Sequence, residues 1–212
     1  MNKINPLTGK DLAGMFRSEE FKALFAEAAD YVFDNGYESC FAVSRDMNTD
    51  EFNFSEFIKG NTVSAEGAAR VSFDSYLVIE LHFHPGIEVY GCCPSEEDLF
   101  RLDAMKHHHK VDYKPIEGIA RIDENKKGEV LLLQENTFKE IPVSALRDLA
   151  GAVYGVVEKK GDIKEIADEI CQAGLHNAAY LKYRLSKGGV LIPDKELRKL
   201  EIFAYEPVLL HD

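Results

Sequence analysis

The segment YLVIELHF, residues 76–83, is the strongest strand pattern in the chain. Its nearly continuous apolar character is typical of a strand at the centre of a sheet, covered on both faces. Pro85 and Gly86 follow directly after His84 and are expected to end the strand. We therefore expect the chain to build a sheet around this segment.

Helices and shorter strands are expected on both sides of this central strand. A helix over about residues 18–34 has Ser18 as its N-cap residue and ends at Asn35-Gly36. The remaining patterns predict one more helix at 95–110, early strands at 38–43, 51–58 and 71–73, and a hairpin of strands at 118–122 and 129–133.

The composition changes in the C-terminal part of the chain. Residues 144–185 are expected to form three helices, with breaks at Gly161-Asp162 and near Gly174, before a last strand over 201–208. The prediction is a mixed α/β domain over residues 10–140, followed by a mostly helical C-terminal extension over 141–212. That extension would pack on the domain or on a second copy of the chain, as a homo-oligomer.

Charge and hydropathy narrow the classes of partner. The chain has 37 Asp and Glu residues against 25 Lys and Arg, a formal net charge of -12, which argues against nucleic acid or an anionic membrane as the main partner. No apolar run approaches the roughly 20 residues of a membrane helix. Residues 1–10 also lack the apolar core of a signal peptide. A cytoplasmic location is therefore expected, with reduced thiols at all four cysteines.

Two histidines at the end of the central strand indicate a metal site. Side chains two positions apart on a strand share a face, so His82 and His84 can converge on one ion. Asp98 lies one turn into the next expected helix, and the intervening loop can bring its carboxylate back to the histidines. Two imidazoles and one carboxylate are a common catalytic zinc set, with a fourth position open to water.

Each part of this pattern also has a structural interpretation. Ser95-x-x-Asp98 resembles a helix capping box, which needs no metal. A single histidine near a strand end is more often structural than a ligand. Two histidines side by side are costly to bury without partners for each ring nitrogen, and this favours the metal site. The capping and metal interpretations are compatible.

The pattern His-x-His-Pro at 82–85, then Ser-x-x-Asp at 95–98, with a glutamate well upstream, resembles the JAMM motif of the MPN/JAB-domain metallopeptidases. That family includes isopeptidases that remove ubiquitin and ubiquitin-like proteins. The resemblance covers roughly residues 15–135. It implies a cytidine-deaminase-like MPN/JAB sheet flanked by helices. It also implies zinc-dependent hydrolysis of peptide or isopeptide bonds, with protein or peptide substrates that include ubiquitin-like conjugates.

The resemblance also assigns roles to individual residues. It makes His82, His84 and Asp98 the ligands of one catalytic zinc ion. Ser95 would stabilise the oxyanion of the tetrahedral intermediate, and Glu38, at the start of the strand after the first helix, would be the general base that activates water. Weaker candidates for the base are Glu51, Glu56, Glu66 and Glu80.

Two phenylalanines depart from the family pattern, and the loop between the ligands is longer than usual. Phe41 stands where a glycine is common. Phe83 replaces a small residue between the histidines and is expected to point away from the metal. Ten residues separate His84 from Ser95, which could reshape the substrate groove.

Other functions predict different sequence features from those of a zinc peptidase. A non-catalytic MPN-type scaffold that only binds partners is the main alternative, although such scaffolds typically lack the ligands that this chain keeps. A zinc deaminase expects His-x-Glu and Pro-Cys-x-x-Cys, where this chain has His-x-His and Cys-Cys-Pro. No Gly-x-Ser-x-Gly nucleophile elbow is present. The run at 107–109 and the pair Cys92-Cys93 are interpreted as a helix end and loop thiols.

Overall fold

One mixed β-sheet organises the chain in the computed structural model. The structure describes residues 7–60, 74–85, 92–105, 111–112, 114–122, 127–137, 139–184, 189–191, 197, 200 and 206–207. In these residues an eight-stranded sheet has the order β2-β1-β4-β6-β7-β8-β9, with β3 paired to β1 as well. The pair β4–β6 is parallel, and the other neighbours are antiparallel. The expectation of a mixed α/β fold is confirmed.

The elements follow one another along the chain as helices and strands of ordinary length. The helices are α1 (Gly9–Arg17), α2 (Glu19–Asn35), α3 (Glu96–Met105), α4 (Val143–Glu158) and α5 (Ile163–Ala173). The strands of the sheet are β1 (Ser39–Asp46), β2 (Phe52–Phe54), β3 (Ile58–Lys59), β4 (Ser75–Phe83), β6 (Ile116–Ile122), β7 (Lys127–Glu135), β8 (His176–Arg184) and β9 (Gly189–Leu191). A separate short ladder joins β5 (Val111–Asp112) and β10 (Glu206–Pro207).

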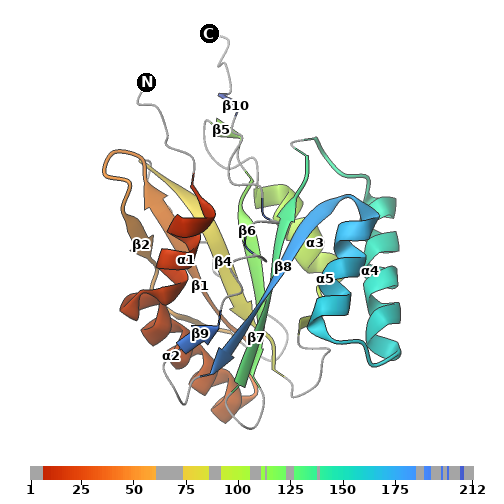
Figure 1. Ribbon diagram of the computed structural model, residues 1–212, viewed down its shortest axis with the longest axis horizontal. Helices are drawn as coiled ribbons and strands as arrows, with labels where there is room; N and C mark the ends of the chain where they lie inside the picture. The colour runs from red at the N-terminus through yellow and green to blue at the C-terminus, as the bar shows by residue number, and fades with distance from the viewer. Residues whose placement is uncertain are drawn as a thin grey trace.

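The helices cover the two faces of the sheet in two groups (Figure 1). On one face, α1 and α2 pack on apolar residues of β1, β4, β6 and β7. On the other face, α3, α4 and α5 enclose a second apolar core. All nine residues of β4 are buried, as expected of a strand between two helical layers. Because β4 is central, the residues at its end lie next to both β1 and β6.

Several local predictions are confirmed. Ser18 caps α2 by accepting a hydrogen bond from the backbone N–H of Phe21, and Gly36 ends the helix in the left-handed conformation, with φ of 66°. The hairpin after the site is the antiparallel pair β6–β7. Phe83 points away from the histidines, since its ring packs on Phe25 with centroids 4.8 Å apart. The expected strand at 71–73 lies outside the described residues.

The C-terminal part differs from its prediction. Two of the three expected helices are present as α4 and α5, but residues 176–184 form β8 and not a third helix. This strand pairs with β7 along its whole length, from His176 opposite Glu135 to Arg184 opposite Lys127. Within the segment predicted to be mostly helical, β8 and β9 are thus strands of the same sheet. The first helix, α1, was also not predicted, although Thr8 and Asp11 form a capping box at its start.

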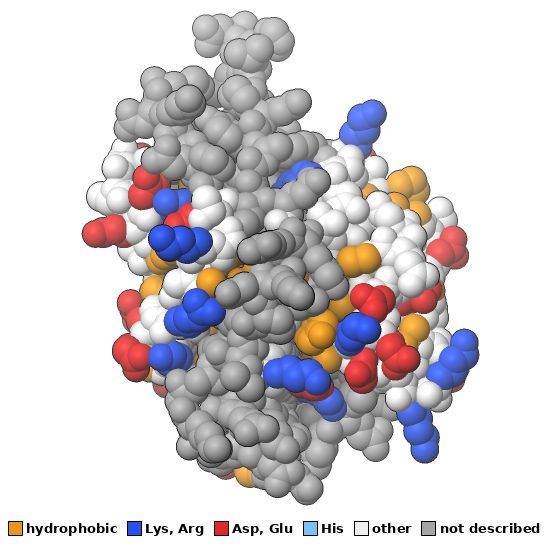
Figure 2. Space-filling model, viewed as in Figure 1, with side chains coloured by type: hydrophobic (Ala, Val, Ile, Leu, Met, Phe, Trp, Pro, Cys, Tyr) orange, Lys and Arg blue, Asp and Glu red, His pale blue; other side chains and the backbone are white. Residues whose placement is uncertain are grey.

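On the face seen in Figure 2, basic and acidic side chains are interspersed among the described residues. No helix in the described part of the chain combines the length and the apolar character needed to cross a membrane.

Replacing Gly118 with alanine is expected to destabilise the protein by about 1–3 kcal/mol, because overpacking a core forces its neighbours to move. A Cβ atom at this position in β6 would lie 2.3 Å from Cδ1 of Leu81, which is fully buried. Gly151 in α4 is the matched control, since its Cβ would meet nothing within 4 Å. Gly151→Ala should stabilise the helix by up to about 1 kcal/mol. Urea unfolding of both variants measures the difference, and equal effects would contradict the packing of β6 against β4.

Candidate metal centre

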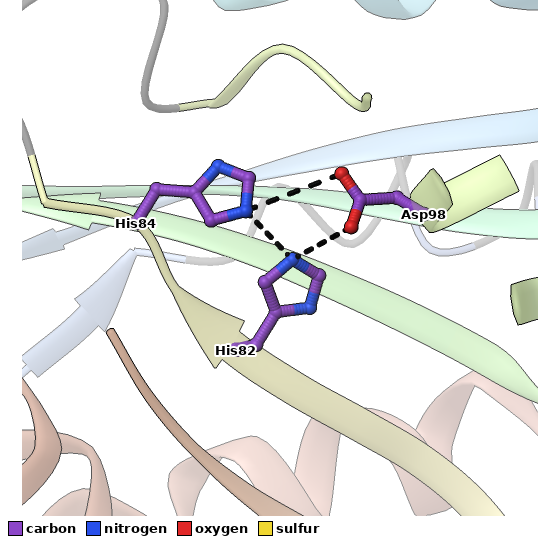
Figure 3. Close-up of side chains that lie close together, drawn as sticks. All are labelled: His82, His84 and Asp98. Atoms are coloured by element: carbon purple, nitrogen blue, oxygen red, sulfur yellow. Dashed lines mark hydrogen bonds and ion pairs between the residues drawn. The ribbon is translucent and has the colours of Figure 1, made fainter. Parts of the chain in front are cut away.

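The side chains of His82 in β4, of His84 directly after it and of Asp98 in α3 converge at the end of β4 (Figure 3). The Nε2 atoms of His82 and His84 are 2.9 Å apart. Oδ1 of Asp98 lies 3.3 Å from Nε2 of His82, and Oδ2 lies 4.0 Å from Nε2 of His84. One potential ligand atom from each residue lies within 4.8 Å of the others. The structure therefore brings together the three residues that the sequence predicted as metal ligands.

Local backbone structure fixes the positions of these residues. His82 is in β4, and the backbone N–H of His84 donates to the carbonyl of Ala120 in β6, at 3.0 Å. Ser95 and Asp98 form the predicted capping box at the start of α3. The backbone N–H of Ser95 donates to Oδ2 of Asp98 at 2.6 Å, and the N–H of Asp98 donates to Oγ of Ser95 at 3.1 Å. The helix cap thus holds the Asp98 carboxylate in front of the histidines.

The donor set and its dimensions fit a small divalent ion. Zinc takes nitrogen and oxygen ligands at about 2.0–2.1 Å, usually in a tetrahedron, which places ligand atoms about 3.3 Å apart. The distances of 2.9 Å between the two Nε2 atoms and 3.3 Å from Nε2 of His82 to Oδ1 of Asp98 lie near that value, and one ligand atom from each of the three residues lies within 4.8 Å of the others. His82 is almost fully buried and Asp98 nearly so, while His84 is partly exposed. A partly exposed ligand leaves an approach for water or substrate.

The charges behind the ligands also favour a cation. Three carboxylates are buried here, those of Glu80, Asp98 and Glu117. The guanidinium of Arg101 contacts all three, at 3.4 Å from Glu80, 3.7 Å from Asp98 and closest to Glu117. Burial raises the pKa of Glu117 to about 8 against the opposing effect of Arg101, so this carboxyl group keeps its proton at neutral pH in the absence of a metal. A divalent ion between the histidines and Asp98 would favour the loss of that proton.

The environment keeps the ligands in the protonation states that a metal requires. Burial lowers the pKa of His82, and burial together with the neighbouring His82 lowers the pKa of His84 to about 4. Burial opposes the charged form of Asp98, but the hydrogen bonds from His82 and from the backbone N–H of Ser95 hold the pKa of this carboxyl below its usual range. Both imidazoles are therefore neutral, and Asp98 is ionised, at neutral pH.

Glu38, the predicted general base, lies on the same side of the sheet as the histidines. Residue 38 directly precedes β1, in which Ser39 pairs with Phe83 and Cys40 with His82. Continuing this antiparallel register by one residue places Glu38 across from His84, and Glu38 acts electrostatically on the His84 imidazole. Its side chain is half-buried. Of the other candidates, Glu51 and Glu56 are exposed, Glu80 is in the Arg101 cluster, and Glu66 lies outside the described residues.

Ser95 is exposed at the start of α3, where its Oγ accepts the N–H of Asp98. Its hydroxyl hydrogen can still be donated to another group. The four cysteines are free thiols, as expected. Burial raises the pKa of Cys40 to about 12 and that of Cys93 to about 11, so these thiols are protonated at neutral pH. The histidine run at 107–109 lies outside the described residues.

Two residues of the site were not predicted. Arg101 is on α3, one turn after Asp98, and Glu117 is on β6. Nη2 of Arg101 lies 2.7 Å from Nδ1 of His82, and Oε1 of Glu117 lies 3.3 Å from the same atom. A glutamate inside an otherwise apolar strand segment, Pro-Ile-Glu-Gly-Ile-Ala at 115–120, was the one pattern in the sequence that could have indicated a role for Glu117.

In the metal-free protein, His84 is expected to contribute stability that is lost as the pH falls from about 6.5 toward 4, whereas Glu117, whose pKa burial raises to about 8, contributes in the opposite direction. The pKa of His84 falls from 6.5 to about 4 on folding, so between these values the unfolded chain binds a proton that the folded chain excludes. The loss amounts to at most about 3 kcal/mol. Urea unfolding of chelator-treated protein at several pH values measures it. Because Glu117 is present in both proteins, the difference in unfolding free energy between the wild type and His84→Asn isolates the His84 contribution. This difference should change against the wild type as the pH falls, and a constant difference would contradict the assignment.

Comparisons with known proteins add no relative. No protein-family model, no curated protein and no solved structure matches this chain.

Proposed function

We propose that this chain is a zinc-dependent hydrolase that cleaves peptide or isopeptide bonds, in line with its resemblance to the JAMM metallopeptidases. The observation that carries the proposal is the convergence of His82, His84 and Asp98 at the end of β4, on the side of the sheet where Glu38 lies. A structural role for the histidines alone would not require a buried carboxylate opposite them.

Each residue has a chemical task in this proposal. His82, His84 and Asp98 would hold the ion, which as a Lewis acid polarises a carbonyl group and lowers the pKa of water. The Glu38 carboxylate would take a proton from the attacking water and later deliver it to the leaving amine. The hydroxyl of Ser95 would donate a hydrogen bond to the oxygen that becomes negative as the carbonyl is attacked.

The proposed class of substrate is taken from the resemblance to the JAMM metallopeptidases. Conjugates of ubiquitin-like proteins, joined through an isopeptide or a linear peptide bond, are the proposed substrates. The partial exposure of His84 and the exposure of Ser95 are consistent with a large substrate that reaches the site from the surface. We propose a protein or peptide partner, with no role for nucleic acid.

Metal content and hydrolysis test the proposal together. Purified protein should contain about one zinc ion per chain, as a set of three protein ligands implies. It should cleave ubiquitin-like fusions encoded in its own genome. Chelation should abolish cleavage, and added zinc should restore it. Zinc binding without cleavage of any fusion would favour the non-catalytic scaffold, and absence of zinc would reject the metal site.

A further inference from the structure

A buried carboxylate lies directly behind the imidazole of His82. Glu117 is on β6, which runs parallel to β4, and is fully buried. Its Oε1 atom is 3.3 Å from Nδ1 of His82, the ring nitrogen opposite the one that faces His84 and Asp98. Its other oxygen, Oε2, has no hydrogen-bond partner among the residues that the structure describes. A carboxylate buried this deeply needs a specific reason to be here.

Arg101 holds this carboxylate in place from α3. Its Nε donates to Oε1 of Glu117 at 3.1 Å, and its Nη2 contacts the same oxygen more closely. Its Nη1 lies 3.4 Å from Oε1 of Glu80 on β4. One guanidinium therefore connects the helix that supplies Asp98 with the two strands that carry His82 and Glu117.

Nδ1 of His82 has two neighbours that require opposite protonation states. Arg101, with Nη2 at 2.7 Å, can only donate, so that contact requires Nδ1 without its proton. Glu117 can accept, so its contact requires Nδ1–H. A neutral imidazole that binds an ion through Nε2 carries its proton on Nδ1. Metal binding at Nε2 therefore selects Glu117 as the hydrogen-bond partner of His82.

We infer that Glu117 is a positioning residue of the metal centre, which accepts the Nδ1–H of His82 and so fixes the tautomer and ring orientation that present Nε2 to the ion. Arg101 keeps the carboxylate at that position. The inference rests on the proposed metal site and extends it to β6. Partners of this kind orient metal-binding histidines, and their loss commonly costs about 10–100-fold in metal affinity.

Competition between the protein and a zinc chelator tests the inference. Glu117→Ala should weaken zinc binding by about 10–100-fold. Glu117→Gln should weaken it less, because the amide oxygen can accept the same hydrogen bond. Glu80→Gln is the matched control, since it removes a buried carboxylate from the same guanidinium while Glu117 stays beside His82. Wild-type affinity in Glu117→Ala, or an equal loss in Glu80→Gln, would overturn the role of Glu117.

Nuclear magnetic resonance of the imidazole nitrogens gives a second measurement, which remains informative if Glu117→Ala fails to fold. In the zinc-loaded wild type, His82 should carry its proton on Nδ1. In Glu117→Gln that proton should resonate further upfield, because a hydrogen bond to an ionised carboxylate is stronger than one to an amide. An unchanged resonance would overturn the role of Glu117 but leave the proposed metal site standing. Absence of zinc binding by the wild type would overturn both the inference and the metal site.

Discussion

Glu38→Gln is expected to lower the rate of hydrolysis by about 10²–10⁴-fold, the contribution of a positioned general base. Zinc content should stay at the wild-type level, because Glu38 is outside the ligand cluster. The amide has almost the shape of the carboxylate, so β1 and its pairing with β4 should be preserved. Initial rates on a cleavable ubiquitin-like fusion, together with metal analysis of the same sample, measure both quantities.

Glu51→Gln is the matched control for this experiment. Glu51 is exposed just before β2 and lies beside Asp46, the last residue of β1. Glu38 directly precedes the first residue of β1, at the opposite end of that strand. The control variant should therefore cleave at the wild-type rate. If Glu38→Gln also cleaves at that rate, the assignment of the general base is wrong, although the metal site itself would remain.

Asp98→Asn is expected to weaken zinc binding by roughly 100-fold or more. That is the upper end of the loss seen for residues that only orient a ligand, and Asp98 is proposed as a ligand itself. Hydrolysis should fall with zinc binding. The substitution removes the charged ligand but leaves an amide oxygen that can still accept the N–H of Ser95, so the start of α3 should persist. Zinc affinity measured by chelator competition, beside a thermal unfolding curve of the metal-free variant, separates the two effects.

Glu165→Gln provides the comparison for the capping box. Glu165 is the third residue of α5 and accepts the backbone N–H of Asp162 at 2.8 Å, as Asp98 accepts that of Ser95 in α3. Both substitutions leave an amide oxygen that can accept the same hydrogen bond, so both should change the stability of the metal-free protein by small amounts. Retention of zinc by Asp98→Asn would show that Asp98 acts as a cap and not as a ligand.

The part of the site that depends on local sequence was predictable. Alternation along a strand places His82 and His84 on one face, and the spacing from Ser95 to Asp98 defines a helix start. Arg101 and Glu117 were not predictable in the same way. Their positions next to His82 depend on the parallel pairing of β4 with β6 and on where α3 lies over the sheet, which are contacts between segments distant in sequence.

In the fold, too, the features set by local sequence were predicted, and a feature set by pairing between distant segments was not. The apolar run of β4 and the hairpin β6–β7 follow from local patterns and were predicted. The segment at 176–184 was predicted as helical, and alanine, found here at 178 and 179, has a high intrinsic preference for helices. In the structure both alanines are fully buried in β8, one in each core. Pairing along β7 outweighs the intrinsic preference of these residues, as is common in sheets.

The helix start that carries Asp98 also bears on which metals the protein can select. Oδ2 of Asp98 already accepts the N–H of Ser95 at 2.6 Å, so Oδ1 is the oxygen left for monodentate coordination. Calcium prefers about six to eight oxygen ligands and often chelating carboxylates, and magnesium an octahedron rich in water. Two imidazoles and one oxygen instead suit zinc, cobalt or nickel. We therefore expect the cap of α3 to help the protein reject the alkaline-earth ions.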